Sequence, residues 1–368
     1  MIGNRTLTLV LALATATMAA GVLRAGESAS SDAPGAVYAL TNSPAGNAVL
    51  VYHRGADGSL TPAGAYPTDG AGNGAGLGSQ GAVVVSDDGR MLFAVNAGSN
   101  SISSFQIRPD GLELASTTPS GGTTPVSVAF KGGLLYALNA GVPNSVSGFS
   151  VGRHGELRPL AGSTQPLSAP DTNPAQVGFS DDGDALIVTE RAANQIDTYT
   201  VGANGLLSAP TVHPSAGPVP FGFAVNKHDT LVVSEAGAGG GASSYRIDED
   251  GSLEPVSSMV MTGQRAACWA VATKNGRYGY VINAGTGNIS GFAISRDGSV
   301  SLLDASGVTA TTGGNPTDAA LSRDSRFLYV RVAVLREVAI FRVASDGSLE
   351  ALPSLTGTPD GLAGLAAF

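Results

Sequence analysis

A recurring unit of 44 to 53 residues constrains this chain more than any other feature of its sequence. Each unit contains an apolar strand, then an alternating strand, then a two-residue turn that is usually Asp-Gly. In six of the units a further strand comes first, as in GAVVVSDDG and AQVGFSDDG. The seven turns begin at Asp57, Asp110, His154, Asn204, Asp250, Asp297 and Asp346.

Short strands separated by turns at a regular spacing predict an all-β repeat fold. Four strands per unit at this period are typical of a β-propeller, and seven units predict seven blades. The first unit lacks its innermost strand, and the C-terminal segment GLAGLAAF supplies an apolar strand without a unit of its own. We therefore expect a single domain over residues 36–368, in which the last strand completes blade one and closes the ring.

The N-terminal residues 1–30 have the layout of a signal peptide. One arginine precedes an apolar run from Leu7 to Leu23, and small polar residues follow. This predicts a secreted or periplasmic protein with a disordered leader and no membrane span after cleavage. An uncleaved anchor is the alternative, because a run of 17 residues is at the short end of spanning length. Cys268 is the only cysteine, which excludes a disulfide framework.

The net charge of −9 argues against a nucleic-acid partner, whose phosphates require clustered Lys and Arg. No segment shows a sustained helical period, so α/β alternatives are also excluded. We expect a monomer whose partner is a small molecule.

Strand order predicts which end of the propeller binds a ligand. Successive antiparallel strands place their connections at alternating ends, so the loops after each second strand share one end with the connectors between blades. These loops are the longer ones and mark the functional face. The residues expected there come from second-strand ends (Asn42, Asn96, Asn139, Glu190, Glu235, Asn283 and Arg331) and first-strand starts (Gln80, Ser127, Gln176, Phe221, Trp269 and Asp318).

This ring of amides and two carboxylates suits a polar ligand. Asn at such positions also caps strand ends and turns, which is the structural alternative. Trp269 is either a stacking platform for a ring-bearing ligand or a residue packed between blades. His213, in the connector PTVHPSAGPVP, is either a base or an exposed bystander. The predicted ligand-binding residues are Asn96, Asn139, Asn283, Gln80, Phe221, Trp269, His213 and Arg331.

Units of the form SxDGRxLxVxNxxxxxIxxFxxxxDGxL resemble the lactonase family of seven-bladed propellers. That family includes bacterial 6-phosphogluconolactonase and the fungal carboxymuconate-lactonising enzyme. The resemblance spans roughly residues 36–368 and is clearest in SDDGRMLFAVNAGSNSISSFQI (86–107) and DALIVTERAANQIDTYTV (184–201). It implies a seven-bladed propeller and lactone chemistry.

The family's phosphogluconolactonases carry a Pro-Arg-His motif at the start of a first strand. The matching segment is NPAQVGFS, with Ala175 in place of the arginine and Gln176 in place of the histidine. Glu190, in VTE, matches the family's glutamate, whereas a family arginine after the next second strand is replaced by Glu235-Ala236. Without these cations, a phosphorylated or carboxylated substrate would lose its bidentate contacts.

These observations lead to the hypothesis of an exported lactonase-like hydrolase that acts on a neutral lactone or cyclic ester. Glu190 would activate water, and Gln176, with Asn139 or Asn283, would donate to the oxyanion. Glu235 would be a second acid or help to hold Ca²⁺ or Mg²⁺. The alternative is a non-catalytic propeller that binds a sugar, a peptide or a protein partner.

The segment GAGLGSQG (74–81) fits the dinucleotide-binding spacing G-x-G-x-x-G. That motif requires a preceding strand and a following helix, and here it runs directly into the strand AVVVSDDG. The segment is therefore interpreted as an enlarged connector between blades one and two, on the same face as Glu190, and a candidate flap over the channel mouth.

Overall fold

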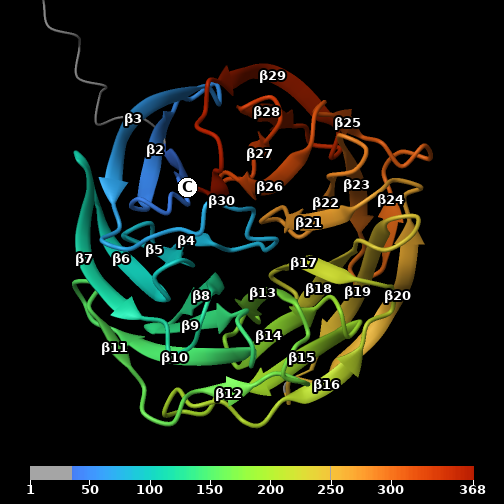
Figure 1. Ribbon diagram of the computed structural model, residues 1–368. Coiled ribbons are helices and arrows are strands. Elements are labelled where there is room, and N and C mark those ends of the chain that lie inside the picture. The colour runs from blue at the N-terminus through green and yellow to red at the C-terminus, as the bar shows by residue number, and fades with distance from the viewer. Residues whose placement is uncertain (1–34, 249) are drawn as a thin grey trace, which may run out of the picture. The chain divides into compact units, whose positions relative to one another are not determined.

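The computed structural model describes residues 35–248 and 250–368, and it confirms the all-β, seven-bladed propeller (Figure 1). Seven antiparallel sheets are arranged in a ring with their first strands at the centre. The predicted signal peptide lies outside the described residues. Within them, no helix is long and apolar enough to cross a membrane.

Each blade is one sheet, and its strands follow one another outward from the centre. Blade one contains β30 (Ala363–Ala367), β1 (Ala36–Leu40), β2 (Ala48–Arg54) and β3 (Leu60–Pro67). Blade two contains β4 (Val83–Val85), β5 (Met91–Asn96), β6 (Ser101–Arg108) and β7 (Gly111–Pro119). Blade three contains β8 (Pro125–Lys131), β9 (Leu134–Asn139), β10 (Ser145–Val151), β11 (Leu157–Pro159) and β12 (Gln165–Pro166). Blade four contains β13 (Pro174–Phe179), β14 (Ala185–Glu190), β15 (Gln195–Thr200) and β16 (Thr211–Pro214).

The remaining three blades follow the same order. Blade five contains β17 (Pro220–Val225), β18 (Thr230–Glu235), β19 (Gly241–Ile247) and β20 (Leu253–Met261). Blade six contains β21 (Ala267–Ala272), β22 (Tyr278–Asn283), β23 (Asn288–Ile294), β24 (Val300–Leu302) and β25 (Ala310–Thr311). Blade seven contains β26 (Pro316–Leu321), β27 (Phe327–Val332), β28 (Glu337–Val343) and β29 (Leu349–Thr356).

The outer strands of blades three and six differ from the expected single strand. In each blade two short segments pair with the same third strand, β11 and β12 with β10, and β24 and β25 with β23. In blade three the first segment ends at Pro159, which has no amide hydrogen to continue the ladder.

The C-terminal strand closes the ring as predicted. β30 pairs with β1 from Val37↔Ala367 to Leu40↔Ala363, and Figure 1 shows the red C-terminal strand beside the blue first blade. The Ala36 amide donates to the Phe368 carbonyl at 3.2 Å, and the Phe368 amide donates to Ala36 at 2.9 Å. The edge that β1 would otherwise expose is therefore paired.

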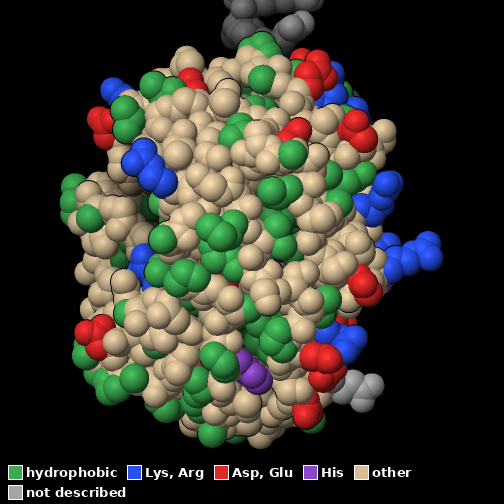
Figure 2. All heavy atoms as spheres, turned by 90° about the vertical axis from the view of Figure 1, so that its right-hand side faces the viewer, with side chains coloured by type: hydrophobic (Ala, Val, Ile, Leu, Met, Phe, Trp, Pro, Cys, Tyr) green, Lys and Arg blue, Asp and Glu red, His purple; other side chains and the backbone are tan. Residues whose placement is uncertain are grey.

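Buried tyrosines on the second strands connect neighbouring blades. The hydroxyl of Tyr280 donates to the Gly347 carbonyl at 2.8 Å, and that of Tyr329 donates to Gly58 at 3.0 Å. Both acceptors lie in the Asp-Gly turn of the following blade. A buried tyrosine hydroxyl requires such a partner, so the repeated turn sequence also serves blade packing. On the outer rim, acidic and basic side chains are interspersed (Figure 2).

We expect deletion of residues 361–368 to lower the midpoint of thermal unfolding by at least ~10 °C, because it removes buried Leu362 and Leu365 and exposes the edge of β1. Differential scanning calorimetry would measure this shift. The control is Leu335→Ala, at a side chain that is 48% exposed, and it should change the midpoint by less than ~2 °C. A truncated protein that melts with the full-length protein would contradict ring closure by β30.

Candidate functional site

A cavity of about 230 Å³ lies at the channel mouth, on the face predicted to bind a ligand. Its walls come from the glycine-rich connector, the first strands of blades six and seven, the second strand of blade seven, and the start of the closing strand. The lining residues are Gly76, Leu77, Gly78, Ser79, Trp269, Thr317, Asp318, Arg331, Leu362, Ala363 and Gly364. Segments distant in sequence thus meet at one site, and three of them carry residues predicted from strand order.

Asp318 combines backbone strain, burial and an unsatisfied carboxylate oxygen. Its φ of 88° lies in a region that residues other than glycine rarely adopt, and its side chain is 3% exposed. Oδ1 accepts the Ala319 amide at 2.8 Å, whereas Oδ2 has no hydrogen-bond partner among the described residues. Burial raises its pKa to about 7, against the opposing effects of the Ala319 amide, the Arg331 guanidinium and the Leu365 amide. Strain and perturbed ionisation of this kind concentrate at functional sites.

A β-bulge places Asp318 in the cavity. The ladder between β26 and β27 shifts between Pro316 and Ala319, and similar shifts occur at the starts of β8, β13, β17 and β21. A bulge redirects the side chain next to it. The equivalent residue is Ser127 in blade three, Gln176 in blade four and Trp269 in blade six, so the residue type at this position varies from blade to blade.

Arg331 reaches the cavity because it is not the last residue of its strand. β27 ends at Val332, which pairs with Glu337, just as β5 ends at Asn96, which pairs with Ser101. Arg331 is one residue earlier, and side chains alternate along a strand. Its guanidinium donates to Thr317 Oγ1. The prediction that Arg331 is equivalent to Asn96 is therefore wrong by one residue, since Val332 is the equivalent of Asn96. The Arg331 side chain consequently lies on the opposite side of its sheet.

The glycine-rich connector is fixed at the cavity by hydrogen bonds from three blades. Trp269 Nε1 donates to the Ser79 carbonyl at 2.9 Å, Ser79 Oγ donates to Val126 at 2.8 Å, and the Gln80 amide donates to Ala175 at 3.1 Å. In Figure 1 this connector extends across the centre of the ring before it enters β4. It therefore forms one wall of the cavity at the channel mouth.

Trp269 and Phe221 pack edge to face, with ring centroids 5.1 Å apart. Arg191 lies over the Phe221 ring at 4.9 Å from its centroid and donates through Nε to the Asn173 carbonyl at 3.0 Å. Burial raises the pKa of the neighbouring Cys268 to about 12. Trp269 thus packs between blades and also lines the cavity, so both sequence interpretations describe part of its role, whereas Phe221 lies behind it.

Gln80 and Gln176 each form a pair of hydrogen bonds, like those between two strands, with the backbone of one residue in another blade. Gln80 donates to the Ala270 carbonyl at 2.7 Å and accepts the Ala270 amide at 3.0 Å. Gln176 makes the same pair of bonds with Phe223, at 3.1 and 2.7 Å. Gly222 allows the Gln80 bridge, because a Cβ there would overlap Gln80 Oε1. Both side-chain amides therefore join blades together.

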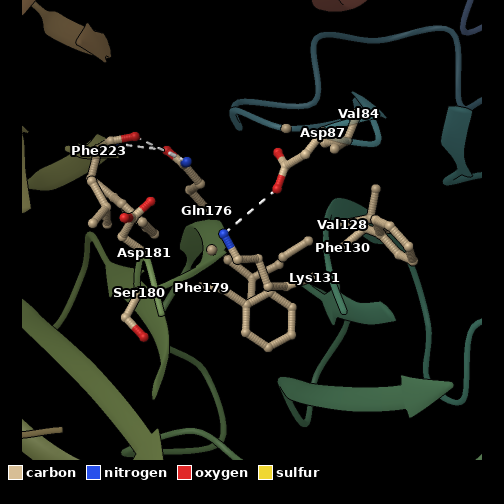
Figure 3. A pocket seen from close by; sticks show the side chains of 15 residues that line it. Val84, Asp87, Val128, Phe130, Lys131, Gln176, Phe179, Ser180, Asp181 and Phe223 are labelled. Atoms are coloured by element: carbon tan, nitrogen blue, oxygen red, sulfur yellow. Dashed lines mark hydrogen bonds and ion pairs between the residues drawn. The ribbon is translucent and has the colours of Figure 1, made fainter. Parts of the chain in front are cut away.

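Gln176 lines a second cavity, of about 280 Å³, at the opposite end of the channel (Figure 3). The turns between first and second strands form its rim, where Lys131 Nζ lies 3.6 Å from Asp87 Oδ2. Phe130, Phe179 and Phe223 belong to its walls. The structure therefore separates Gln176 from the cavity that contains Asp318.

The three predicted asparagines are fully buried within their own blades. Asn96 donates to Ser103 at 2.9 Å, and Asn283 donates to Ser290 at 2.8 Å. Asn139 makes longer contacts with Ser145 and Ser147, at 3.5 and 3.4 Å. Each amide connects the end of a second strand to a third strand, which is the capping role that the sequence left as the alternative.

Glu190 occupies the same position in blade four and is also fully buried. The Ser168 amide donates to Glu190 Oε1 at 3.1 Å and to Asp197 Oδ2 at 2.8 Å, and Ser168 Oγ donates to Glu190 Oε2. Burial and the adjacent Glu190 raise the pKa of Asp197, because both disfavour its charged form. Glu190 does not line the Asp318 cavity.

Glu235 is the corresponding residue of blade five. Its Oε1 accepts hydrogen bonds from Ser215 Oγ at 2.8 Å and Ser243 Oγ at 2.6 Å. Burial raises its pKa from 4.5 to about 7, and the two serine hydroxyls oppose the increase. Among the described residues, no group of three or more His, Cys, Asp or Glu side chains is placed to hold a metal ion.

His213 lies in β16, the outermost strand of blade four, and not in a connector as expected. Its ring contacts Thr198 Oγ1 at 3.0 Å, and burial lowers its pKa. The strand pairs with β15 through Ile196↔His213, which places His213 on the periphery of the ring.

Sequence reasoning did not select Asp197 or Arg191, and it listed Asp318 without a role. Asp197 lies on the third strand of blade four. The equivalent residue is a serine in blades two, three, five and six, namely Ser103, Ser147, Ser243 and Ser290. Comparing third strands between repeats would have revealed it. The strain at Asp318 has no comparable signal in the sequence.

The comparisons with known proteins agree with this architecture. The sequence matches the protein family described as "Lactonase, 7-bladed beta-propeller" over residues 37–165, 142–268 and 235–362. No curated protein sequence matches this chain significantly. A candidate 6-phosphogluconolactonase from Bacteroides fragilis superimposes with a TM-score of 0.71 at 18% identity, over 93% of this chain and 100% of that chain. The periplasmic gluconolactonase of Pseudomonas aeruginosa has a TM-score of 0.70 at 19% identity, over 90% and 99%. At these identities the structural likeness shows the fold.

We expect Glu235→Gln to reduce the loss of stability with rising pH. A carboxyl whose pKa is raised on folding holds its proton more tightly in the folded protein than in the unfolded chain. Its contribution to the free energy of unfolding is therefore greatest below about pH 4.5 and is lost as the pH rises through about 7. The decline from this residue is of order 3 kcal/mol. Urea-unfolding free energies between pH 5 and 8 would measure it, with the exposed Glu113→Gln as the control. If the free energy of unfolding changed equally with pH in Glu235→Gln and in the unmodified protein, the raised pKa of Glu235 would be contradicted.

Proposed function

Because the chain belongs to the family of seven-bladed β-propeller lactonases, we propose that it hydrolyses a neutral lactone in the cavity at the channel mouth. Asp318 is the general base and Arg331 polarises the carbonyl. The observation that carries this proposal is that Asp318, whose backbone is strained and whose carboxyl is buried, lines one cavity together with Arg331.

The residues of the cavity fit the steps of ester hydrolysis. Deprotonated Asp318 accepts a proton from water as the water oxygen attacks the lactone carbonyl carbon. The negative charge that develops on the carbonyl oxygen is stabilised by the Arg331 guanidinium. When the ring C–O bond breaks, the proton passes from Asp318 to the departing alkoxide, and the product is an open-chain hydroxy acid. Asp318 is regenerated as a carboxylate.

The charge of the cavity supports a neutral substrate. Its lining contains one cationic and one acidic side chain, Arg331 and Asp318. Their charges offset each other, so the site does not offer the multiple cations that a phosphate group requires. Ala175, at the family's arginine position, is fully buried beside Phe221 and Trp269 and supplies no charge.

In this proposal Glu190 is a structural carboxyl. Its hydrogen bonds from Ser168 hold the connector that leads into blade four. The earlier hypothesis that Glu190 activates water is therefore the main competitor to Asp318, and substitutions at the two positions distinguish them.

We expect Asp318→Asn to reduce the kcat for a responsive lactone by at least ~100-fold, the effect typical of losing a general base. A pH-stat assay of the purified protein against a lactone panel, with and without EDTA, would find the substrate and measure the loss. The exposed acid Asp171 on the same face supplies the control, Asp171→Asn. Full activity in Asp318→Asn with a large loss in Glu190→Gln would transfer the role of base to Glu190. Saturable binding without turnover of any lactone would instead support the binding-protein alternative.

The pH dependence of turnover should follow the ionisation of Asp318. Because the base must be deprotonated, kcat should rise with pH and level off above the pKa of about 7. Rates would be measured between pH 5 and 8.5 and corrected for spontaneous hydrolysis. A rate that is constant down to pH 5 would exclude a base with this pKa.

We also propose that the protein acts outside the cytoplasm. The signal-like residues 1–30 support this, and the similar Pseudomonas aeruginosa protein is described as periplasmic. Expression in a Gram-negative host should yield periplasmic protein whose intact mass lacks the apolar run 7–23. A full-length protein retained in the membrane fraction would support the anchor alternative.

A further inference from the structure

The cavity at the channel mouth is small and its walls are mainly apolar. Its volume of about 230 Å³ is below the ~300–1,000 Å³ typical of pockets for larger ligands. Leu77, Trp269, Leu362 and Ala363 supply apolar surface, and glycines supply most of the remaining wall. The space therefore suits a single small ring with a short substituent.

Most polar side-chain atoms of the lining are already engaged in hydrogen bonds. Ser79 Oγ donates to the Val126 carbonyl at 2.8 Å, and the Ser79 carbonyl accepts Trp269 Nε1 at 2.9 Å. Thr317 Oγ1 accepts a hydrogen bond from Arg331. This leaves the Asp318 carboxyl and the other N–H groups of Arg331 as the principal side-chain partners for a ligand. They are enough for one ester group and one water molecule.

Resting on the proposed function, we infer that the substrate is an alkyl-substituted lactone and not a polyhydroxylated sugar lactone. Ring hydroxyls that enter this cavity would leave water without gaining partners, which weakens binding. An alkyl substituent would instead remove apolar surface from water against Leu77 and Leu362. A pocket built this way selects substrates through the penalty on unpaired polar groups.

Leu77 is the residue at which this selectivity can be changed with least disturbance. It belongs to the connector at the channel mouth, is half-buried, and lines the cavity. Leu362 is the more deeply buried wall residue, at 2% exposed, so a polar substitution there would also destabilise the ring closure. Leu77→Asn adds a donor and an acceptor to the cavity, and Leu77→Ala enlarges it without adding polarity.

The experiment compares kcat/KM for γ-caprolactone and glucono-δ-lactone, measured on the same enzyme. We expect the alkyl lactone to be favoured by at least ~10-fold, within the range that apolar pocket contacts provide. Leu77→Asn should reduce that ratio by ~10-fold, whereas Leu77→Ala should retain the preference and extend it to a longer alkyl chain. Leu335→Asn, at an exposed leucine outside the cavity, should leave the ratio unchanged, and melting midpoints would verify that each variant is folded.

The outcomes separate this inference from the proposed function. Efficient hydrolysis of glucono-δ-lactone with little action on γ-caprolactone would overturn the inference and leave lactone hydrolysis intact. If folded Leu77→Asn kept the same ratio of kcat/KM for the two lactones, the role of Leu77 in substrate selection would be overturned. Hydrolysis of neither lactone, nor of any other in the panel, would overturn the proposed function and the inference together.

Discussion

The pairing of β30 with β1 is the interaction on which the rest of the structure depends. It joins the two ends of the described domain into one blade and completes the ring. It also places Leu362, Ala363 and Gly364 opposite β26, where they become one wall of the cavity that contains Asp318. The closure of the fold and the formation of the candidate site therefore have the same cause, and the site exists only in the closed ring.

The repeat in the sequence was sufficient to predict the number of blades, the closing strand and the end of the ring at which Trp269, Asp318 and Arg331 lie. Those features depend on strand count and on the alternation of connections, which one sequence displays. The direction of individual side chains was not predictable in the same way. A bulge at the start of the first strands and a one-residue difference at the end of β27 decide that Asp318 and Arg331 enter the cavity. Single-residue shifts of register leave no signal in the hydrophobic pattern.

The buried carboxyls illustrate why a match to a family motif does not by itself locate chemistry. Glu190 and Glu235 occupy the position that is asparagine in blades two, three and six, and all five side chains are fully buried. The asparagines and Glu235 bond to serines of their own third strands, whereas Glu190 accepts hydrogen bonds from Ser168 in the connector before its blade. These buried contacts indicate a structural role, in which a carboxyl replaces an amide at some cost in desolvation. Asp318 differs because it lines a cavity together with the cationic Arg331.

The most direct test of this site is a crystal structure of the protein with δ-valerolactam, which has the shape of a lactone and resists hydrolysis. We expect the lactam in the cavity at the channel mouth, with its carbonyl oxygen within hydrogen-bond distance of the Arg331 guanidinium and its carbonyl carbon facing Asp318 Oδ2. A lactam bound in the cavity of Gln176 at the opposite end, or beside Glu190, with the Asp318 cavity empty, would contradict the assignment.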